Sequence, residues 1–179
     1  MNEWKTYKLS EIGTIVSGAT PSTSVARYYG GDIPWLTPKD LSTFQGRFIG
    51  HGERNITQAG LDSCSAQLLP AGTVLFSSRA PIGYVAIAQN PITTNQGFKS
   101  VIPNEEVDSL FLYYSLKYNK EKIESMGSGT TFKEVSGSTM KNVELSLPSL
   151  KEQKRIAKLL GSIDDKIETN YRINDNLAN

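Results

Sequence analysis

Cysteine and histidine are almost absent from this sequence, which contains one of each. A lone Cys64 excludes an internal disulfide and a metal cluster built from cysteines. A lone His51 argues against a conventional zinc centre, which takes several histidine or cysteine ligands. We interpret Cys64 as a small buried or half-buried side chain and His51 as a loop residue between two glycines. No metal is therefore expected in this chain.

Long hydrophobic runs are also missing. No window of about eighteen apolar residues occurs, so no membrane-spanning helix and no membrane partner are expected. The first residues, MNEWKTYKLSEIG, contain no apolar segment of the kind found in secretory signals. We therefore expect a cytoplasmic protein.

Net charge is the third feature that is nearly absent, at +1. Residues 1–148 carry as many acidic as basic side chains, so this part of the chain is formally neutral. Nucleic-acid-binding domains are usually more basic. A DNA-binding function would therefore need a local patch or help from a partner.

Short strands and turns dominate the first hundred of the 179 residues. β-branched and aromatic residues between glycine or proline predict strands, and periodic apolar residues predict a helix. Ser10 and Thr57 are candidate caps of short helices, and two prolines make residues 30–42 extended. Strands and helices do not alternate regularly, which favours an α+β fold. The predicted strands are 71–78, 83–89, 97–103 and 143–147, and the predicted helix is 107–125, with 127–132 as a loop.

The end of the chain is predicted to be one long helix. Ser149 and Glu152 form a capping-box pattern directly after Pro148. From there, apolar and Asn residues alternate by four and three, as in a coiled-coil seam, and the helix would be roughly 45 Å long. We favour self-association or a partner helix over the alternative, in which the first half packs on the body and the second half frays. The seam residues are Ile156, Leu160, Ile163, Ile167, Asn170, Asn174 and Leu177.

Several segments together resemble the specificity (S) subunit of type I restriction–modification systems. They are GATPSTS (18–24), IPWLTPKDL (33–41), GTVLFSSRAPIGYVAI (72–87), TTNQGFKSVIP (93–103), GSGTTFKEVSGSTMKNVELSLP (127–148) and KEQKRIAKLLGSIDDKIETNYRINDNL (151–177). The resemblance implies a target-recognition domain over 1–148 and a conserved-region helix over 149–179. A full-length S subunit resembles two such units in tandem, so the chain is either a natural half-subunit that dimerises or part of a longer chain.

The resemblance also implies a function without catalysis. The S subunit reads double-stranded DNA and holds methyltransferase (M) subunits, which bind S-adenosylmethionine, while a restriction (R) subunit adds cleavage. The implied location is a bacterial or archaeal cytoplasm. The sequence agrees with this, because it has no Gly-rich cofactor fingerprint after a strand and no Asn/Asp-Pro-Pro motif. Asp164 and Asp165 lie beside Lys166 and Glu168, which we interpret as a solvated helix face and not as a nuclease site.

Candidate DNA contacts follow from residue type. Lys, Arg, hydroxyls and free amides bind phosphates, whereas Arg, Asn and Gln can read base edges. The loop GSGTTFK suits phosphates, and the polar stretch 39–58, with Gln45 and Gln58, suits bases. A mobile loop and, for Arg79, a structural hydrogen bond are the alternatives. The candidates are Lys39, Arg47, Arg54, Asn55, Arg79, Asn95, Gln96, Lys99, Ser128, Thr130, Thr131 and Lys133.

The long helix would then have a mechanical function. Two such helices packed antiparallel would hold two recognition domains about one turn of DNA apart, and a homodimer would read a palindromic, interrupted site. Two other classes remain open. An adaptor could assemble proteins without binding DNA, in keeping with the neutral body, and a nuclease or methyltransferase acting alone would need motifs that we do not find.

Overall fold

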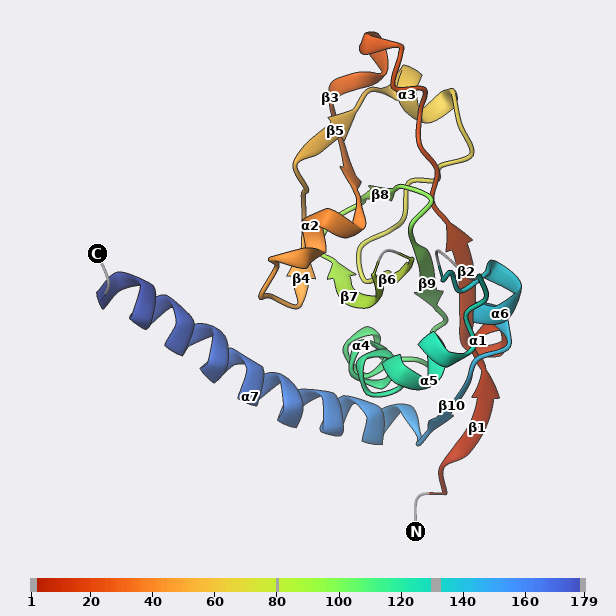
Figure 1. The fold of residues 1–179 in the computed structure, drawn as a ribbon. Coiled ribbons are helices and arrows are strands. Elements are labelled where there is room, and N and C mark those ends of the chain that lie inside the picture. The colour runs from red at the N-terminus through yellow and green to blue at the C-terminus, as the bar shows by residue number, and fades with distance from the viewer. Residues whose placement is uncertain (1–2, 80, 130–132, 178–179) are drawn as a thin grey trace.

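The computed structural model describes residues 3–79, 81–129 and 133–177, with side chains up to residue 174. Its centre is a five-stranded mixed sheet in the order β2-β9-β6-β7-β4 (Figure 1). The side chains of β6 and β7 are almost all buried, because both strands lie inside the sheet with a neighbour on each side. The five strands are β2 (Gly13–Ser17), β4 (Phe48–Ile49), β6 (Val74–Ser78), β7 (Ile82–Ala88) and β9 (Lys99–Pro103).

Two smaller sheets flank the central one. β1 (Lys5–Lys8) pairs antiparallel with β10 (Glu144–Leu147), the strand just before the last helix. β3 (Tyr29–Leu36) pairs with β5 (Arg54–Ile56) and, over two residues, with β8 (Thr93–Thr94). This second sheet forms the end of the body farthest from the last helix (Figure 1).

The body helices are short and capped by their local sequences. In α2 (Pro38–Ser42), Thr37 and Asp40 form a capping box, and Pro38 occupies the first turn, where its missing N–H costs nothing. Asp108 caps α4 (Ser109–Tyr118) by accepting a hydrogen bond of 2.9 Å from the Phe111 amide. The others are α1 (Leu9–Ile12), α3 (Gln58–Asp62), α5 (Lys120–Ser125), α6 (Gly137–Lys141) and a 3-10 turn (Ala26–Tyr28).

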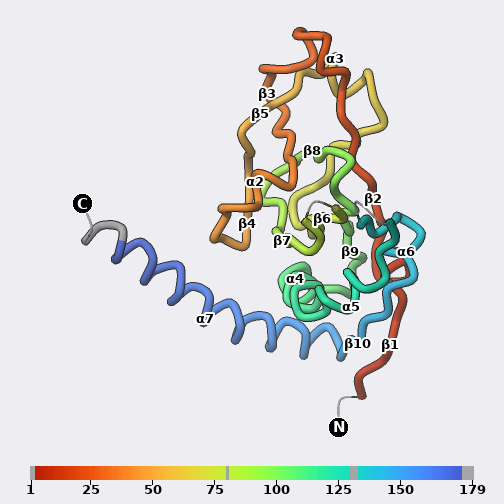
Figure 2. Tube along the Cα trace, viewed as in Figure 1, coloured from red at the N-terminus to blue at the C-terminus, as the bar shows by residue number. Residues whose placement is uncertain are grey.

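Two groups of buried side chains stabilise the body. The larger group lies between the central sheet and α4 and includes Phe76, Leu112 and Leu116. The smaller group lies toward β3 and includes Leu36, Leu75 and Phe98. The α4 helix therefore separates the central sheet from the last helix, α7, as Figure 2 shows.

The last helix, α7 (Leu150–Leu177), has 28 residues, and its second half extends away from the body (Figure 1). Its first half is anchored to the body, because Gln153 and Ala157 are 2% exposed and Ile156 packs against the larger core. The Gln153 side chain donates to the carbonyls of Glu106 and Pro148 and accepts from the Asp108 amide. The first half of α7 thus packs on the body, as predicted by the alternative in which only the second half of the helix is free.

The α+β prediction and the long C-terminal helix are confirmed. The four predicted strands correspond to β6, β7, β9 and β10, and Thr57 caps α3 as predicted. Three details are wrong: helix 107–125 is interrupted at Asn119, Lys8 and not Ser10 caps α1, and residues 38–42 are helical. Glu152 binds Arg155 at 2.9 Å, and its expected capping box with Ser149 stays a prediction. The division of the chain at residue 148 stays a prediction.

No helix in the described part of the chain is long and apolar enough to cross a membrane.

Candidate DNA-recognition surface

The start of α2 presents the first candidate cation at the surface. Lys39 donates to Glu53 at 2.8 Å, and the Asp40 carboxylate accepts from the Glu53 amide at 2.7 Å. The hydrogen bond between Lys39 and Glu53 raises the pKa of Lys39 and lowers that of Glu53, so both stay charged near neutral pH. Lys39 is 79% exposed at its side chain, so an arriving phosphate can compete with Glu53 for it.

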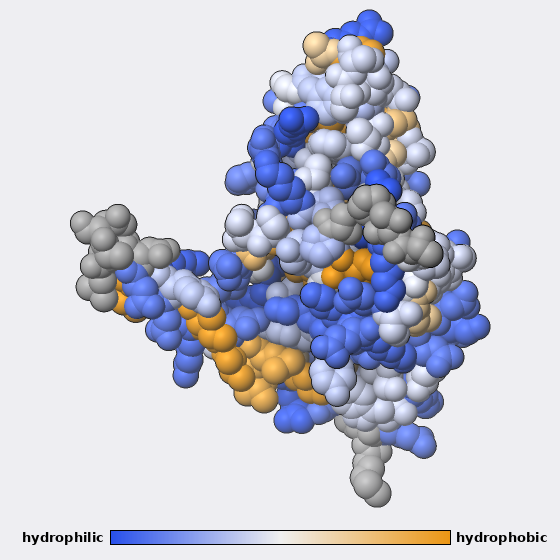
Figure 3. Space-filling model, viewed as in Figure 1, coloured by the Kyte–Doolittle hydropathy of each residue, from blue (hydrophilic) through white to orange (hydrophobic). Residues whose placement is uncertain are grey.

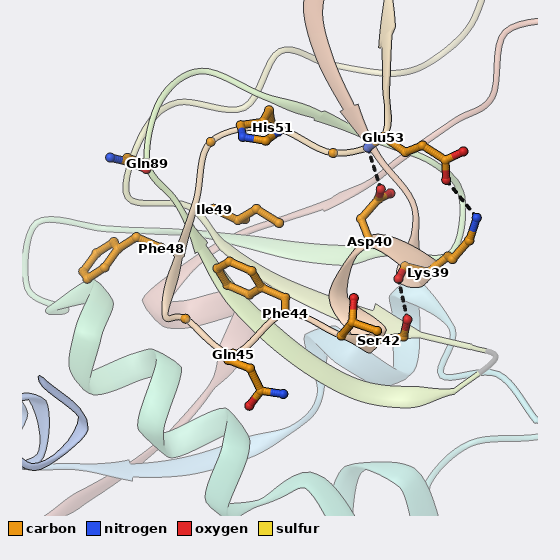
Figure 4. Close-up of a pocket in the computed structure, with 14 residues that line it drawn as sticks. Lys39, Asp40, Ser42, Phe44, Gln45, Phe48, Ile49, His51, Glu53 and Gln89 are labelled. Carbon is orange, nitrogen blue, oxygen red and sulfur yellow. Dashed lines mark hydrogen bonds and ion pairs between the residues drawn. The ribbon is translucent and has the colours of Figure 1, made fainter. Parts of the chain in front are cut away.

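Between α2 and β5 the chain forms a loop, residues 43–53, around a cavity of about 780 Å³. Phe44 and Ile49 lie inside the loop, whereas Gln45 and Phe48 point outward (Figure 4). The carboxylates of Asp40 and Glu53 on its lining are already hydrogen-bonded, as described above. Within the residues that the structure describes, no group of three or more His, Cys, Asp or Glu could hold a metal ion.

Next to this cavity, the strand that carries Arg54 and Asn55 runs along the edge of the β3 sheet. The two residues pair with Trp35 and Pro34 of β3, and Arg54 is exposed while Asn55 is half-buried. Gln58 follows on α3 and is exposed, but its amide donates to Asp62 at 2.8 Å. Of this stretch, Arg54 is therefore the candidate with the freest access to solvent.

A second group of candidates converges on Glu134. Its carboxylate binds Lys99 at 3.3 Å and Arg79 at 3.7 Å, and its main chain pairs with Ser128. Gln96 joins the group because its carbonyl accepts from the Lys99 ammonium at 3.4 Å. Residues from three distant segments are thereby brought together, which the sequence did not predict.

Access differs within this second group. Lys99 is 7% exposed, so we no longer expect it to contact DNA. Its buried ammonium pairs with the Glu134 carboxylate instead. Gln96, Ser128 and Lys133 are exposed and Arg79 is half-buried. Asn95 is half-buried and uses its side-chain oxygen to accept from the Gly97 amide. Thr130 and Thr131, the other two candidates of the loop, lie outside the described residues.

The two groups border one another. A Cβ added at Gly97 would lie 2.7 Å from the ring of Pro38, which shows how closely the turn after Asn95 approaches the start of α2. The Thr20 hydroxyl donates to Gln96, which ties the segment 18–24 to the same turn. Lys39 and Gln96 therefore lie on segments that are neighbours in space, and we give the name recognition surface to the candidates of both groups that remain available to DNA. Its members are Lys39, Arg54, Asn55, Arg79, Gln96, Ser128 and Lys133.

Arg47 is the clearest correction to the sequence-based candidates. It is 8% exposed and binds α7, with Nε donating to Glu168 at 3.1 Å, Nη1 to the Gly161 carbonyl at 3.1 Å and Nη2 to Asp165. Burial opposes its charge, but the hydrogen bonds with Asp165 and Glu168 outweigh it and raise the Arg47 pKa. A guanidinium held in this way has little left to offer a base, so we no longer expect Arg47 to contact DNA.

An apolar stripe on α7 remains uncovered. Leu159, Ile163, Ile167 and Ile173 are 45–63% exposed, and hydrophobic surface follows the helix in Figure 3. Of the predicted seam, Ile156 and Leu160 are half-buried, Ile163 and Ile167 are exposed, and Asn170 and Asn174 are exposed. The Leu177 side chain lies outside the described residues. Exposed apolar rows of this length are uncommon on monomeric proteins and mark contact surfaces.

With these features in place, comparison with known proteins becomes informative. Residues 1–179 match the family described as the type I restriction modification DNA specificity domain. The chain belongs to this family. The type I restriction enzyme MjaIX specificity subunit of Methanocaldococcus jannaschii is 48% identical over 175 residues, which are 97% of this chain and 40% of the relative. The HindI specificity subunit of Haemophilus influenzae is 32% identical over 149 residues, which are 82% of this chain and 32% of the relative.

Solved structures agree with this assignment. A chain from a structure described as the basis of complex assembly and conformational transition of the type I R-M system superposes with a TM-score of 0.74 at 25% identity, over 97% of this chain and 41% of its own length. The HsdS subunit of Thermoanaerobacter tengcongensis gives a TM-score of 0.69 at 25% identity, over 95% of this chain and 39% of its own. The chain thus spans about two fifths of these proteins. The relatives are named specificity subunits, in agreement with the prediction that this type I specificity domain is not an enzyme.

Two structural residues of this domain were not identified from the sequence. Glu134 organises the second group of candidates, and Gln153 anchors α7 through three hydrogen bonds. Nothing in the segment FKEVSG marks Glu134, because its partners are distant in the chain. Gln153 had one signal: it is a polar residue on the side of the helix where Ala157 and Gly161 follow, at the spacing of a buried face.

Proposed function

We propose that this chain is a DNA-recognition unit of a type I restriction–modification complex that reads one half of a bipartite target. The observation that carries the proposal is the family match over the whole chain, from the recognition surface to α7. The recognition surface supports it with exposed Lys, Arg and Gln side chains gathered from distant segments. These are the residue types that bind phosphates and base edges.

The proposal assigns no chemical step to this chain. Methyl transfer would belong to methyltransferase (M) subunits, which would bind S-adenosylmethionine, and cleavage to a restriction (R) subunit where one is present. Lys154 and Lys158 are exposed on the side of α7 opposite Ile163 and Ile167, and this side could receive such subunits. The neutral body fits a unit that relies on partners to hold DNA.

The exposed stripe of α7 supports pairing with a second helix. The proposed partner is an identical chain, packed antiparallel, which gives a two-fold axis between the two bodies. The helix of 28 residues is ~42 Å long, comparable to one turn of DNA. A homodimer would then read a palindromic, interrupted site with a spacer set by the helix.

Binding to duplexes selected from a randomised pool tests this function. The purified chain should retain a bipartite sequence, and the logarithm of its affinity should fall linearly with the logarithm of salt concentration. Arg54→Gln and Lys133→Gln should each lower the salt slope by about 1 if they contact phosphates. Lys154→Gln, on α7, removes an equal charge outside the recognition surface and should leave the slope unchanged.

An adaptor without DNA binding is the second candidate, and the formal neutrality of residues 1–148 favours it. It predicts that no sequence is enriched from the pool and that any DNA retention is equal for all duplexes. Enrichment of a bipartite sequence by this chain would exclude the adaptor. Methyl transfer or cleavage by the chain alone would contradict both.

A further inference from the structure

The loop that carries Arg47 is tied to the body and to α7 at the same residue. Its carbonyl accepts from the Ile87 amide at 2.7 Å, and the next two residues pair with β7. Its side chain crosses to α7 and reaches a main-chain carbonyl and two carboxylates, at Gly161, Asp165 and Glu168. Arg47 therefore connects the central sheet to almost two turns of α7.

The contact is made where α7 has few others. Among the described residues, the hydrogen bonds from the body to α7 beyond Gly161 come from Arg47 and from Tyr114, whose hydroxyl donates to Asp164 at 2.7 Å. Farther along, a cavity of about 440 Å³ separates Gln45 and Gly46 from Tyr171 and Arg172. The second half of α7 is therefore held by Arg47 and Tyr114 as far as Glu168, and borders a cavity beyond it.

Gly161 is suited to this contact. A Cβ added there would lie 3.1 Å from Nη1 of Arg47 and 3.4 Å from Leu110. Glycine inside a helix is less favourable than alanine, so its presence here needs a structural reason. At this position its missing side chain leaves room for the guanidinium against the helix surface.

We propose that Arg47 is a positioning residue that sets the direction of the second half of α7 relative to the recognition surface, and thereby the spacer length that a paired unit selects. The spacer part of this inference rests on the proposed function. The direction of the helix does not, because it is a property of the single chain.

The geometry indicates how large the effect is. With Arg47 in place the unsupported arm runs from Glu168 to Leu177, ~14 Å, and without it from Asp164, which Tyr114 still holds, ~20 Å. A tilt of about 10° would move the end of the longer arm by ~3.5 Å, which is close to the rise of one base pair, about 3.4 Å. The displacement of the helix end after loss of the contact is therefore sufficient to change the preferred spacer length by one base pair.

Distances between spin labels test the positioning. Labels are attached at Lys141→Cys in the body and at either Arg172→Cys or Lys154→Cys on α7, in a Cys64→Ser background. Labelled chains are diluted with unlabelled chains, so that only distances within one chain contribute. In Arg47→Met, the distance from 141 to 172 should broaden and shift by about 2 Å for a tilt of about 10°, whereas that from 141 to 154 should stay as in the unchanged chain.

Two further variants keep the test decisive. Asp165→Asn with Glu168→Gln removes the charges from the exposed side of the contact and should reproduce Arg47→Met even if the latter folds poorly. Arg155→Met removes an exposed arginine of α7 that pairs with Glu152 on the same helix, and should change neither distance. Unchanged distances to residue 172 in both test variants would overturn the proposal, and so would broadening to residue 154, which would mean that the whole helix had detached.

The spacer is then tested on the selected bipartite site, with the spacer lengthened or shortened one base pair at a time. Arg47→Met should discriminate between spacers roughly threefold to tenfold less than the unchanged chain, while its affinity for a single half-site is retained. Equal discrimination would refute the spacer role even if the labels move. Failure of the unchanged chain to select any site would refute the proposed function, and the label distances would still decide whether Arg47 positions α7.

Discussion

Replacing two exposed isoleucines of α7 should abolish self-association without unfolding the chain. Ile163 and Ile167 are 50% and 45% exposed, so roughly half of each side chain is available to a partner helix. Complete burial of such a side chain contributes about 2 kcal/mol, which makes about 1 kcal/mol for the available half. In a two-fold dimer the contact contains these two side chains from each of the two chains.

The double substitution Ile163→Ser and Ile167→Ser therefore affects four side chains and should weaken the dimer by about 4 kcal/mol, roughly a thousandfold in the dissociation constant. Light scattering over a concentration series measures this directly. The unchanged chain should approach twice its mass of 19.7 kDa, whereas the variant should stay at the monomer mass.

Lys158→Ser is the matched control, because Lys158 is exposed on the opposite side of α7 and its loss should leave the dimer intact. Circular dichroism should give the same helix content for all three proteins. A dimer of unchanged strength in the double variant would refute the assignment of the stripe as the contact. A monomer at every concentration for the unchanged chain would refute the homodimer, and the partner helix would then have to come from another chain.

Three further predictions concern stability. Gly18→Ala should destabilise the body by about 2 kcal/mol or more in urea unfolding, because its Cβ would lie 2.1 Å from a main-chain oxygen, whereas Gly137→Ala, with its nearest neighbour at 3.8 Å, should stay within about 1 kcal/mol. Gln153→Ala should cost about 2 kcal/mol, because it removes the hydrogen bonds of the buried Pro148 carbonyl, the half-buried Asp108 and the exposed Glu106, whereas Lys154→Ala next to it should cost almost nothing; equal costs would contradict the anchor. Burial and the hydrogen bond to Asp164 raise the pKa of Tyr114 above its ordinary value of 10.0. The stabilisation that Tyr114 gives to the folded chain is therefore complete below about pH 10 and is lost as the pH rises through the folded pKa. Tyr114→Phe should lose less stability than the unchanged chain in alkaline urea unfolding, and an identical loss would refute this.

The elements that could be predicted are those whose signal lies within one segment. The strands β6 and β7 are recognisable from their apolar and β-branched residues, and α7 from its periodicity over many turns. The two-residue strands β4 and β8 have no such signal, because both are defined by their parallel neighbours. Pro34 and Pro38 predict an extended segment over 30–42, whereas Thr37 and Asp40 form a capping box around Pro38 and residues 38–42 are helical.

The candidate site shows the same limit. Residue type alone identified Arg79, Gln96 and Ser128 as polar donors, and the fold brings them around Glu134. Residue type could not distinguish Arg47 from Arg54, because the partners of Arg47 lie more than a hundred residues away in the sequence. An arginine that holds the fold and an arginine open to solvent differ only in their surroundings.

The pairing of β1 with β10 has a mechanical consequence. Lys5 lies opposite Leu147, so the chain enters and leaves the body at the same end of this two-stranded sheet. A pull between Lys5 and the start of α7 would open the four residue pairs one after another, as in unzipping, and would not load them together in shear. Tension along this path would therefore separate the strand before α7 at low force, while the central sheet and its core stay out of the line of pull.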